Sequence, residues 1–251
     1  MRKWRLVLAL MTSCAASSGY VTQCSHMLSV VTADGLVDYA ALRNDPSLSA
    51  CGKAIAQTQP WRLRPRERLM FWVNVYNLTS ILDLARDSKR WGPKQDGKAL
   101  FTDEKLVIGG QRYTLDQIEY VEMPKLNADP RIEFLLSCGS RGCSLLPPVL
   151  VTPENYDQLL RDGVTRFFGE RWNLEIDWDN KTVFTSQLLA PDWHGKDFAA
   201  TGETIEALIA KELSRRGDQR AADALLSGML KLHYRPYDWR MNRVVRQFAL
   251  P

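Results

Sequence analysis

The longest helical pattern in this chain of 251 residues is PRERLMFWVNVYNLTSILDLARDS, residues 65–88. Proline is favoured at the first position of a helix, so Pro65 marks where this one begins. Apolar side chains then occupy much of the helical circumference instead of a single stripe, which is typical of a helix covered on several sides. We therefore expect residues 65–88 to form a central buried helix on which the rest of the chain packs.

Two hairpins are predicted on either side of the middle of the chain. Residues 105–108 and 111–115 flank Gly109-Gly110, and glycines tolerate the positive φ of a tight turn. Residues 174–178 and 182–186 form the second pair around Asp179-Asn180. A further strand is expected near residues 230–234. Residues 131–137 favour a buried strand ending at Cys138, with a helix as the alternative.

Between these strands the sequence predicts helices at residues 46–58, 153–168, 203–215 and 218–226. Asp116 with Glu119 three residues later indicates a capping box at the start of a short helix. Strands that meet through hairpins, with helices between the groups, favour an α+β fold. We expect a single domain in which an antiparallel-dominated sheet packs around the central helix, not a doubly wound parallel sheet.

The amino terminus has the composition of a secretory signal. A basic start, residues 1–5, precedes the apolar residues 6–11 and the small residues 12–18. The apolar stretch is too short for a transmembrane helix. We therefore expect residues 1–18 to direct export, and residues 19–251 to fold as one globular domain in the periplasm or anchored at the membrane of a bacterium. The formal net charge is +4, and Arg2, Lys3 and Arg5 supply three of those charges, so nothing favours nucleic-acid binding.

Five cysteines bear on this interpretation. Met11-Thr-Ser-Cys14 resembles the lipobox of bacterial lipoproteins, in which the cysteine receives a lipid anchor; simple cleavage near residues 16–18 is the alternative. Removing Cys14 would leave four cysteines, which can form two bridges in an oxidising compartment. The most local of the three connectivities pairs Cys24 with Cys51 and Cys138 with Cys143, and spacing alone leaves the others open.

Five ordered motifs carry a family resemblance: FWVNVYN at 71–77, DQIE at 116–119, DPRI with SCGSRGC at 129–143, Trp193 with Asp197-Phe198, and YDWRMN at 237–242. With VDY at 37–39, this order resembles the family called domain of unknown function 547 over about residues 34–242. That family is found in exported bacterial proteins and in plant proteins, and its activity is uncertain. The resemblance therefore implies a fold more than a reaction.

The family pattern also implies where chemistry would lie, because it places one histidine after Ile-Glu and another after Arg-Ile, near the cysteine motif. A histidine beside a cysteine makes a thiolate nucleophile. This chain has Tyr120 and Glu133 at those positions, and a carboxylate near a thiol raises the thiol pKa. His194, beside Trp193, is the one histidine inside a motif; it is a candidate base, although a surface histidine or a hydrogen-bonded structural one is the preferred interpretation.

The other motif residues have structural and functional alternatives. A structural disulfide is preferred for Cys138 and Cys143, with a free reactive Cys138 as the alternative. Glu119 is assigned to the capping box. The amides of Asn74 and Asn77 either lock a neighbouring loop or face a pocket, and locking is preferred. Tyr237 and Asp238 favour a packing corner, with Asp238 able to orient a histidine. The remaining pocket or motif candidates are Trp72, Arg141, Asp197 and Asn242.

Two classes of function are compatible with these patterns. We expect an exported cell-envelope protein that binds a small molecule or an envelope component, or serves a structural role, without catalysis. The alternative is a cysteine-dependent hydrolase or acyl transferase centred on Cys138. The chain contains no phosphate loop, dinucleotide fingerprint or zinc-protease motif, and we expect neither a metal site nor a cofactor.

Overall fold

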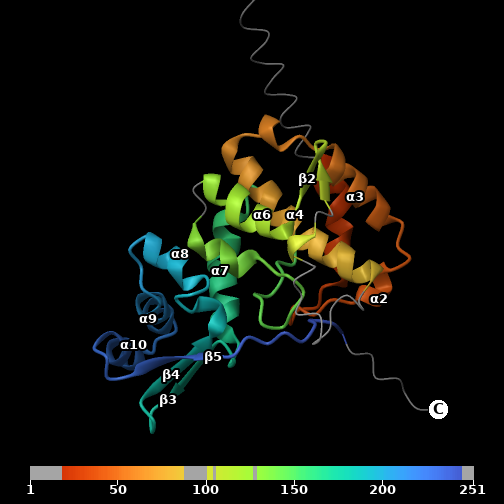
Figure 1. Ribbon diagram of the computed structural model, residues 1–251. Coiled ribbons are helices and arrows are strands. Elements are labelled where there is room, and N and C mark those ends of the chain that lie inside the picture. The colour runs from red at the N-terminus through yellow and green to blue at the C-terminus, as the bar shows by residue number, and fades with distance from the viewer. Residues whose placement is uncertain (1–18, 88–100, 104–105, 127–128, 245–251) are drawn as a thin grey trace, which may run out of the picture.

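The computed structural model describes residues 19–87, 101–103, 106–126 and 129–244 (Figure 1). The predicted signal segment, residues 1–18 with Cys14, lies outside the described residues. Ser88 and Lys105, at the ends of two predicted elements, also lie outside them. Within the described part of the chain, no helix is both long and apolar enough to cross a membrane.

The predicted central helix is present as α4, Pro65–Arg86. Its residues from Leu69 to Leu82 are buried on all sides, because helices and loops from both ends of the chain cover it. The short helix η1, Ser25–Val30, with α2, Tyr39–Leu42, and α3, Ser47–Gln57, packs around it, and Cys24–Cys51 joins the start of the described chain to α3. This part of the molecule forms the first of two hydrophobic clusters.

The first hairpin pairs β1, Leu106–Ile108, with β2, Gln111–Tyr113, in antiparallel register. Gly109 and Gly110 have φ values of 57° and 87°, and a side chain at Gly109 would collide with Trp61. The chain continues through α6, Leu115–Gln117, the π-helical turn η4, Ile118–Glu122, and the 3₁₀ turn η5, Pro124–Leu126. The hairpin therefore leads directly into the segment that carries Glu119 and Tyr120.

The second hydrophobic cluster contains the remaining helices and a three-stranded sheet. The helices are α7, Tyr156–Gly169; α8, Gly195–Ala200; α9, Ile205–Arg215; and α10, Gln219–Leu226. The strands are β3, Leu174–Asp177; β4, Thr182–Ser186; and β5, Lys231–Arg235, in the order β3-β4-β5. β3 and β4 form the predicted antiparallel hairpin, whereas β5 pairs parallel to β4 after the crossover through α8, α9 and α10. The fold is of the expected α+β class.

Two local predictions were wrong. Residues 131–137 do not form a strand: a 3₁₀ helix, η6, spans Pro130–Leu135, because the Asp129 side chain accepts from the Arg131 backbone N–H and Pro130 opens the first turn. The capping box at α6 is also formed by other residues than expected. Thr114 and Gln117 cap each other's backbone donors, which leaves Glu119 to point elsewhere.

After β5 the chain runs back across the molecule (Figure 1). Backbone donors of Arg141 and Gly142 bond the carbonyls of Arg240 and Asp238 at 2.7 and 2.8 Å. A side chain on Gly142 would collide with the Tyr237 ring, so glycine permits this close approach. The return segment brings Tyr237 against the cysteine motif, where Cys143 packs against both hydrophobic clusters.

Candidate functional site

A cavity of about 420 Å³ lies where these segments meet. Its walls come from α4, from the turn that carries Glu119 and Tyr120, from η6 and the cysteine motif, and from the segments at 193–194 and 237–239. Residues far apart in sequence therefore meet at one site. Its lining includes Tyr76, Glu119, Tyr120, Glu133, Cys138, Cys143, Trp193, His194, Tyr237 and Trp239.

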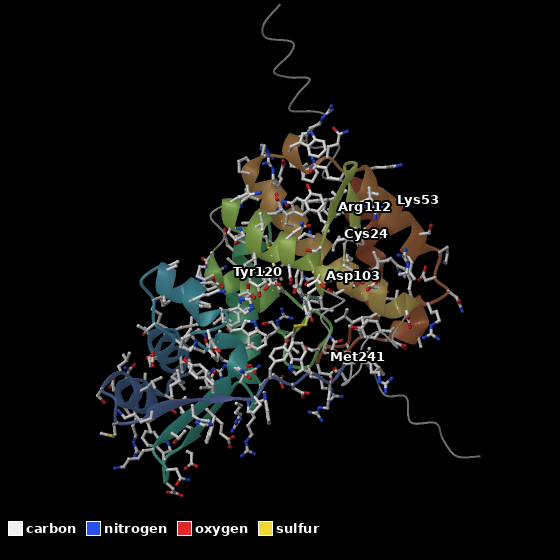
Figure 2. All side chains as sticks on the ribbon, in the orientation of Figure 1. Cys24, Lys53, Asp103, Arg112, Tyr120 and Met241 are labelled. Carbon is white, nitrogen blue, oxygen red and sulfur yellow. A yellow bond between two sulfur atoms is a disulfide. The ribbon has the colours of Figure 1, made fainter. Side chains whose placement is uncertain are left out.

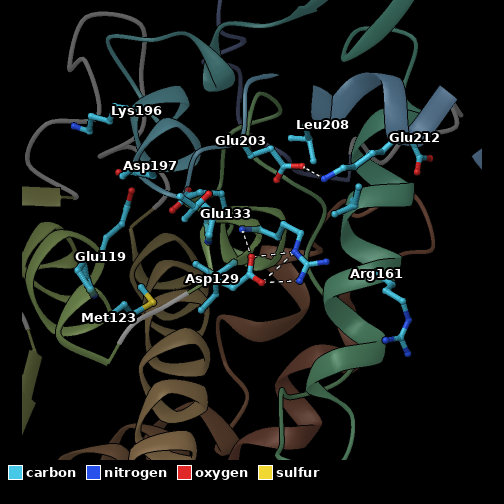
Figure 3. A pocket seen from close by; sticks show the side chains of 18 of the residues that line it. Glu119, Met123, Asp129, Glu133, Arg161, Lys196, Asp197, Glu203, Leu208 and Glu212 are labelled. Carbon is cyan, nitrogen blue, oxygen red and sulfur yellow. Dashed lines mark hydrogen bonds and ion pairs between the residues drawn. The ribbon is translucent and has the colours of Figure 1, made fainter. Parts of the chain in front are cut away.

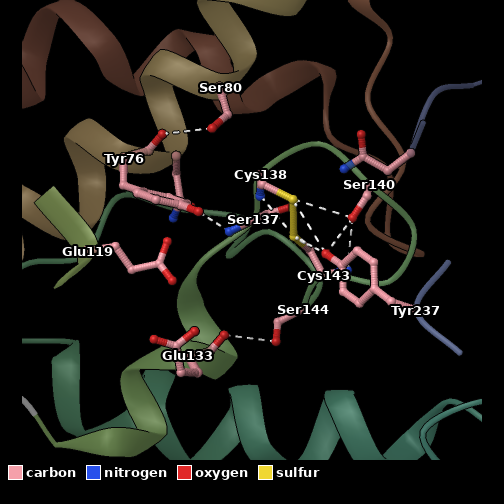
Figure 4. Close-up of a disulfide and its surroundings, with 12 residues drawn as sticks. Tyr76, Ser80, Glu119, Glu133, Ser137, Cys138, Ser140, Cys143, Ser144 and Tyr237 are labelled. Carbon is pink, nitrogen blue, oxygen red and sulfur yellow. Dashed lines mark hydrogen bonds between the residues drawn. A yellow bond between two sulfur atoms is a disulfide. The ribbon is translucent and has the colours of Figure 1, made fainter. Parts of the chain in front are cut away.

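Cys138 and Cys143 form a disulfide on one side of the cavity (Figure 4). The hydroxyl of Tyr237 lies 3.5 Å from the Cys138 sulfur and 3.0 Å from the Cys143 sulfur, and it is 2.6 Å from the Ser140 hydroxyl. Burial raises the pKa of Tyr237 well above its ordinary value, so the phenol keeps its proton near neutral pH. The disulfide is thus held among neutral hydroxyl groups.

His194 lies opposite, with carboxylates on both edges of its ring. Its Nε2 atom is 3.4 Å from Glu119 Oε1, and its Nδ1 atom is 3.4 Å from Glu133 Oε2. Asp197, in the first turn of α8, reaches Nδ1 at 3.3 Å. The side chains of Glu119 and His194 are 7% and 4% exposed, so this is a buried ionisable cluster and not a surface network.

The electrostatics of the cluster follow from this burial. Burial raises the pKa of Glu133 to about 8, although the charge on His194 opposes the shift, and it raises the pKa of Glu119 in the same way. Burial alone would lower the pKa of His194, but the carboxylates of Glu133, Asp197 and Glu119 outweigh it and raise the value to about 9. These carboxylates therefore favour the charged form of the imidazole.

Aromatic rings form another wall of the cavity. The Trp193 ring stacks on His194 with centroids 6.1 Å apart, and it contacts Tyr237 at 4.8 Å. Trp239, which is 45% exposed, lies 4.6 Å from the Tyr237 ring. Tyr120, labelled in Figure 2, stacks on His194 with ring centroids 6.0 Å apart, and it is 44% exposed. The cavity thus combines apolar ring faces with buried carboxylates.

A larger cavity, of about 1340 Å³, shares Glu119, Tyr120 and Glu133 with the first. In Figure 3, the labelled Glu119, Glu133 and Asp197 lie together at one end of it. Farther along this cavity, Arg131 pairs with Asp129 at 2.6 Å and Lys211 pairs with Glu203.

Several sequence candidates do come together here. Cys138, Cys143, Glu119, Tyr120, Glu133, Trp193, His194 and Tyr237 all line the smaller cavity, and Asp197 contacts His194. The structure also changes the interpretation of two residues, Glu133 and Glu119. Glu133, which replaces a family histidine, is a direct partner of His194, and Glu119 belongs to the same cluster.

Other candidates have structural contacts away from the cavity. Asn74 bonds the backbone of Val151, and Asn77 bonds Leu135 and Ser137, as the preferred locking role requires. Trp72 is buried against Tyr113 and Phe71, Arg141 is exposed, Asp238 pairs with Arg240, and Asn242 accepts from Tyr39.

Tyr76 and Trp239 are among the lining residues that sequence reasoning missed. Both lie inside the quoted motifs, at 71–77 and 237–242, so motif membership was the signal that could have found them. The two residues line the same cavity because the segment after β5 runs back across the molecule, and no local sequence pattern predicts that path.

The fold and site define an α+β protein with a disulfide and a buried carboxylate–histidine cluster in one pocket. Residues 60–168 match a family model described as "Protein of unknown function, DUF547". The match includes Glu119, Glu133 and Cys138, whereas His194 and Tyr237 lie beyond it. No curated protein and no solved structure matches the chain.

Proposed function

We propose that this protein acts in the bacterial cell envelope as a non-catalytic binding protein, and that the smaller cavity holds its ligand. The observation that carries the proposal is the pairing of Cys138 with Cys143. A sulfur in a disulfide is not a thiolate and cannot attack a substrate. The envelope location rests on the export signal expected at residues 1–18, a compartment in which such disulfides persist.

The surroundings of the sulfurs support the same interpretation. Among the described residues, the side chains that form hydrogen bonds with Cys138 Sγ are the hydroxyls of Ser140 and Tyr237. The buried histidine of the cavity, His194, makes its polar contacts with carboxylates. A general base directed at Cys138 is therefore lacking in the described part of the site.

The lining favours a ligand of mixed character. Trp193 and Trp239 offer ring faces on which an apolar or aromatic group can stack. Glu119 and Glu133 accept hydrogen bonds and favour positive charge. We infer a small molecule, or an exposed group of an envelope component, with an apolar face and a polar group that donates hydrogen bonds.

An apolar fluorescent amine tests the pocket directly. We expect N-phenyl-1-naphthylamine to show a saturable fluorescence increase with the wild-type protein, because the dye would enter the ring-lined cavity. Trp239→Ala should weaken binding about five-fold, as loss of one aromatic contact does. Trp172→Ala is the matched control, because Trp172 is 48% exposed and lies outside this cavity. Equal binding by both variants, or none by the wild type, would contradict the proposal.

The alternative function is a cysteine-dependent hydrolase or acyl transferase. It is favoured by the fact that both sulfurs line the cavity, so that reduction would expose a thiol there. An activated ester such as p-nitrophenyl acetate, offered to the reduced protein, distinguishes the two functions. We expect no saturable turnover that depends on Cys138. Turnover that Cys138→Ser abolishes would establish the alternative and overturn the binding proposal.

A further inference from the structure

Three buried side chains from different segments place possible metal-ligand atoms close to one another. One donor atom each of Glu119, Glu133 and His194 lies within 4.8 Å of the other two. Glu119 comes from η4, Glu133 from η6, and His194 from the residue that precedes α8. The fold as a whole, and not a local sequence motif, assembles this donor set.

The distances within the set fit coordination better than direct hydrogen bonding. Asp197 hydrogen-bonds the Nδ1 atom of His194. Glu119 Oε1 lies 3.4 Å from Nε2 and Glu133 Oε2 lies 3.4 Å from Nδ1, and neither glutamate forms a hydrogen bond to the ring in the described structure. Metal bonds of about 2.1 Å at tetrahedral angles separate neighbouring ligand atoms by about 3.4 Å. The contact between Nε2 and Glu119 Oε1 therefore has the length of one edge of a tetrahedral site.

Asp197 gives the imidazole a hydrogen-bond partner on one of its two ring nitrogens. Its carboxylate lies 3.3 Å from Nδ1, so that Nε2, which is 3.4 Å from Glu119 Oε1, is the nitrogen left without a hydrogen bond in the described structure. A carboxylate behind a histidine in this way is the common outer shell of metal-binding histidines, because it fixes the tautomer and raises the basicity of the other nitrogen. The side chain of Asp197 is 41% exposed, so it lies at the edge of the site and not among the buried ligands.

The charge of the two buried carboxylates gives a further reason to expect a bound cation. Ionised Glu119 and Glu133 beside a neutral imidazole would place two negative charges in a site that is almost closed to water. Buried charge is costly unless it is paired or coordinates a cation. One divalent cation would balance both carboxylates.

We propose that Glu119, Glu133 and His194 bind one divalent transition-metal cation, and that Asp197 is the positioning residue that hydrogen-bonds the imidazole. One nitrogen with two carboxylate oxygens suits Zn²⁺ or Mn²⁺. Three protein ligands leave at least one coordination position for water or a ligand in the smaller cavity, which all three residues line. The metal site does not depend on the state of Cys138 and goes beyond the proposed binding function.

Calorimetry on untagged, chelator-treated protein under non-reducing conditions tests this site. Titration with Zn²⁺ or Mn²⁺ should show one saturable site per chain. Glu119→Gln and Glu133→Gln should each weaken binding at least about 10-fold, and Asp197→Asn about 10- to 100-fold through the outer shell. Glu203→Gln is the matched control, because Glu203 pairs with Lys211 outside the donor set, and it should bind like the wild type. Absence of saturable binding by the wild type, or unchanged binding by both site variants, would overturn the proposal.

The visible spectrum of Co²⁺ in the wild-type protein provides a test that needs no folded variant. Tetrahedral nitrogen and oxygen ligation should give d–d bands without the near-ultraviolet sulfur charge transfer that a cysteine ligand produces. Sulfur charge transfer would contradict the ligand set, and so would the featureless weak spectrum of hydrated Co²⁺.

Discussion

Tyr120 and Glu133 occupy the two positions at which the family pattern has histidine, and both side chains line the cavity that contains Cys138. The negative charge of a carboxylate opposes ionisation of a nearby thiol, and the pKa of Tyr120 is raised well above its ordinary value by burial and by Glu119. Neither residue supplies the imidazole that the resemblance implies beside the cysteine motif. The two replacements therefore remove the groups that would favour a thiolate at Cys138.

Restoring the two histidines tests this interpretation. After reduction, Tyr120→His with Glu133→His should alkylate faster at Cys138 near neutral pH than the reduced wild type, because an imidazolium lowers the thiol pKa and a carboxylate raises it. Each unit by which the pKa falls adds up to about 10-fold in thiolate fraction. The measurement is the pH dependence of iodoacetamide modification, with Cys138→Ser identifying the thiol that responds. A reduced wild type that already reacts as fast as the double variant would refute our reading of these two positions.

The sequence does not predict the cluster of Glu119, Glu133 and His194, because each residue has a local explanation of its own. His194 belongs to a motif, Glu119 fits a capping box, and Glu133 stands where the resemblance implies a histidine. Their encounter depends on contacts between η4, η6 and the start of α8, which no spacing in the sequence expresses.

At the scale of elements, α4 organises the site without contributing charge to it. Asn77 donates to the Leu135 carbonyl at 2.8 Å and accepts from the Ser137 backbone at 2.8 Å, so it fixes the segment between η6 and Cys138. Helix α4 could be predicted because apolar residues occupy much of its own circumference. The conformation of the segment after Asp129 could not be predicted, because a short apolar run is buried equally well as a strand or as a 3₁₀ helix.

Asn77→Ala should therefore destabilise the fold by about 2–4 kcal/mol, since two buried backbone groups lose their partner. The measurement is the free energy of unfolding from urea denaturation. Asn180→Ala, in the exposed turn between β3 and β4, should cost less than about 1 kcal/mol. Equal losses in the two variants would show that the amide on α4 does not lock the loop.

Helix α9 supplies a prediction about pH. Burial raises the pKa of Glu212, but hydrogen bonds from Arg215 and Arg216 outweigh it and hold the pKa below the ordinary carboxyl value. A lowered pKa in the folded state stabilises the protein above about pH 4.3, and this stabilisation is lost as pH falls through the folded pKa. Glu212→Gln should therefore be less stable than the wild type by about 1–2 kcal/mol at pH 7. The difference in unfolding free energy should shrink at pH 3; a difference that does not change with pH would refute this role.

At the scale of the whole molecule, two hydrophobic clusters meet at the cysteine motif, and the return of the chain after β5 closes the cavity between them. The α+β class followed from hairpins and helix starts, which are local signals. The parallel pairing of β5 with β4 was not foreseen, because it depends on the crossover through three helices. The family match at residues 60–168 covers less of the chain than the resemblance suggested, which extended to about residues 34–242.

The export expected from residues 1–18 can be tested separately. A reporter fused after Ser18 should appear outside the cytoplasm, because residues 1–18 have a basic start, an apolar core and small residues at the end. If Cys14 carries a lipid, Cys14→Ser should move the protein from the membrane fraction or block its maturation. Retention of the reporter in the cytoplasm would contradict export, and identical fractionation of Cys14→Ser and wild type would exclude the anchor.

The central claim is that Cys138 is bound to Cys143 and is not a nucleophile. Intact mass measured after alkylation of the denatured Cys14→Ser protein tests it most directly, because that variant retains only the cysteines of the two disulfides. We predict no added alkyl groups without reductant and four after reduction. Two alkyl groups added without reductant and mapped to Cys138 and Cys143 would contradict the account and return Cys138 to the position of a candidate nucleophile.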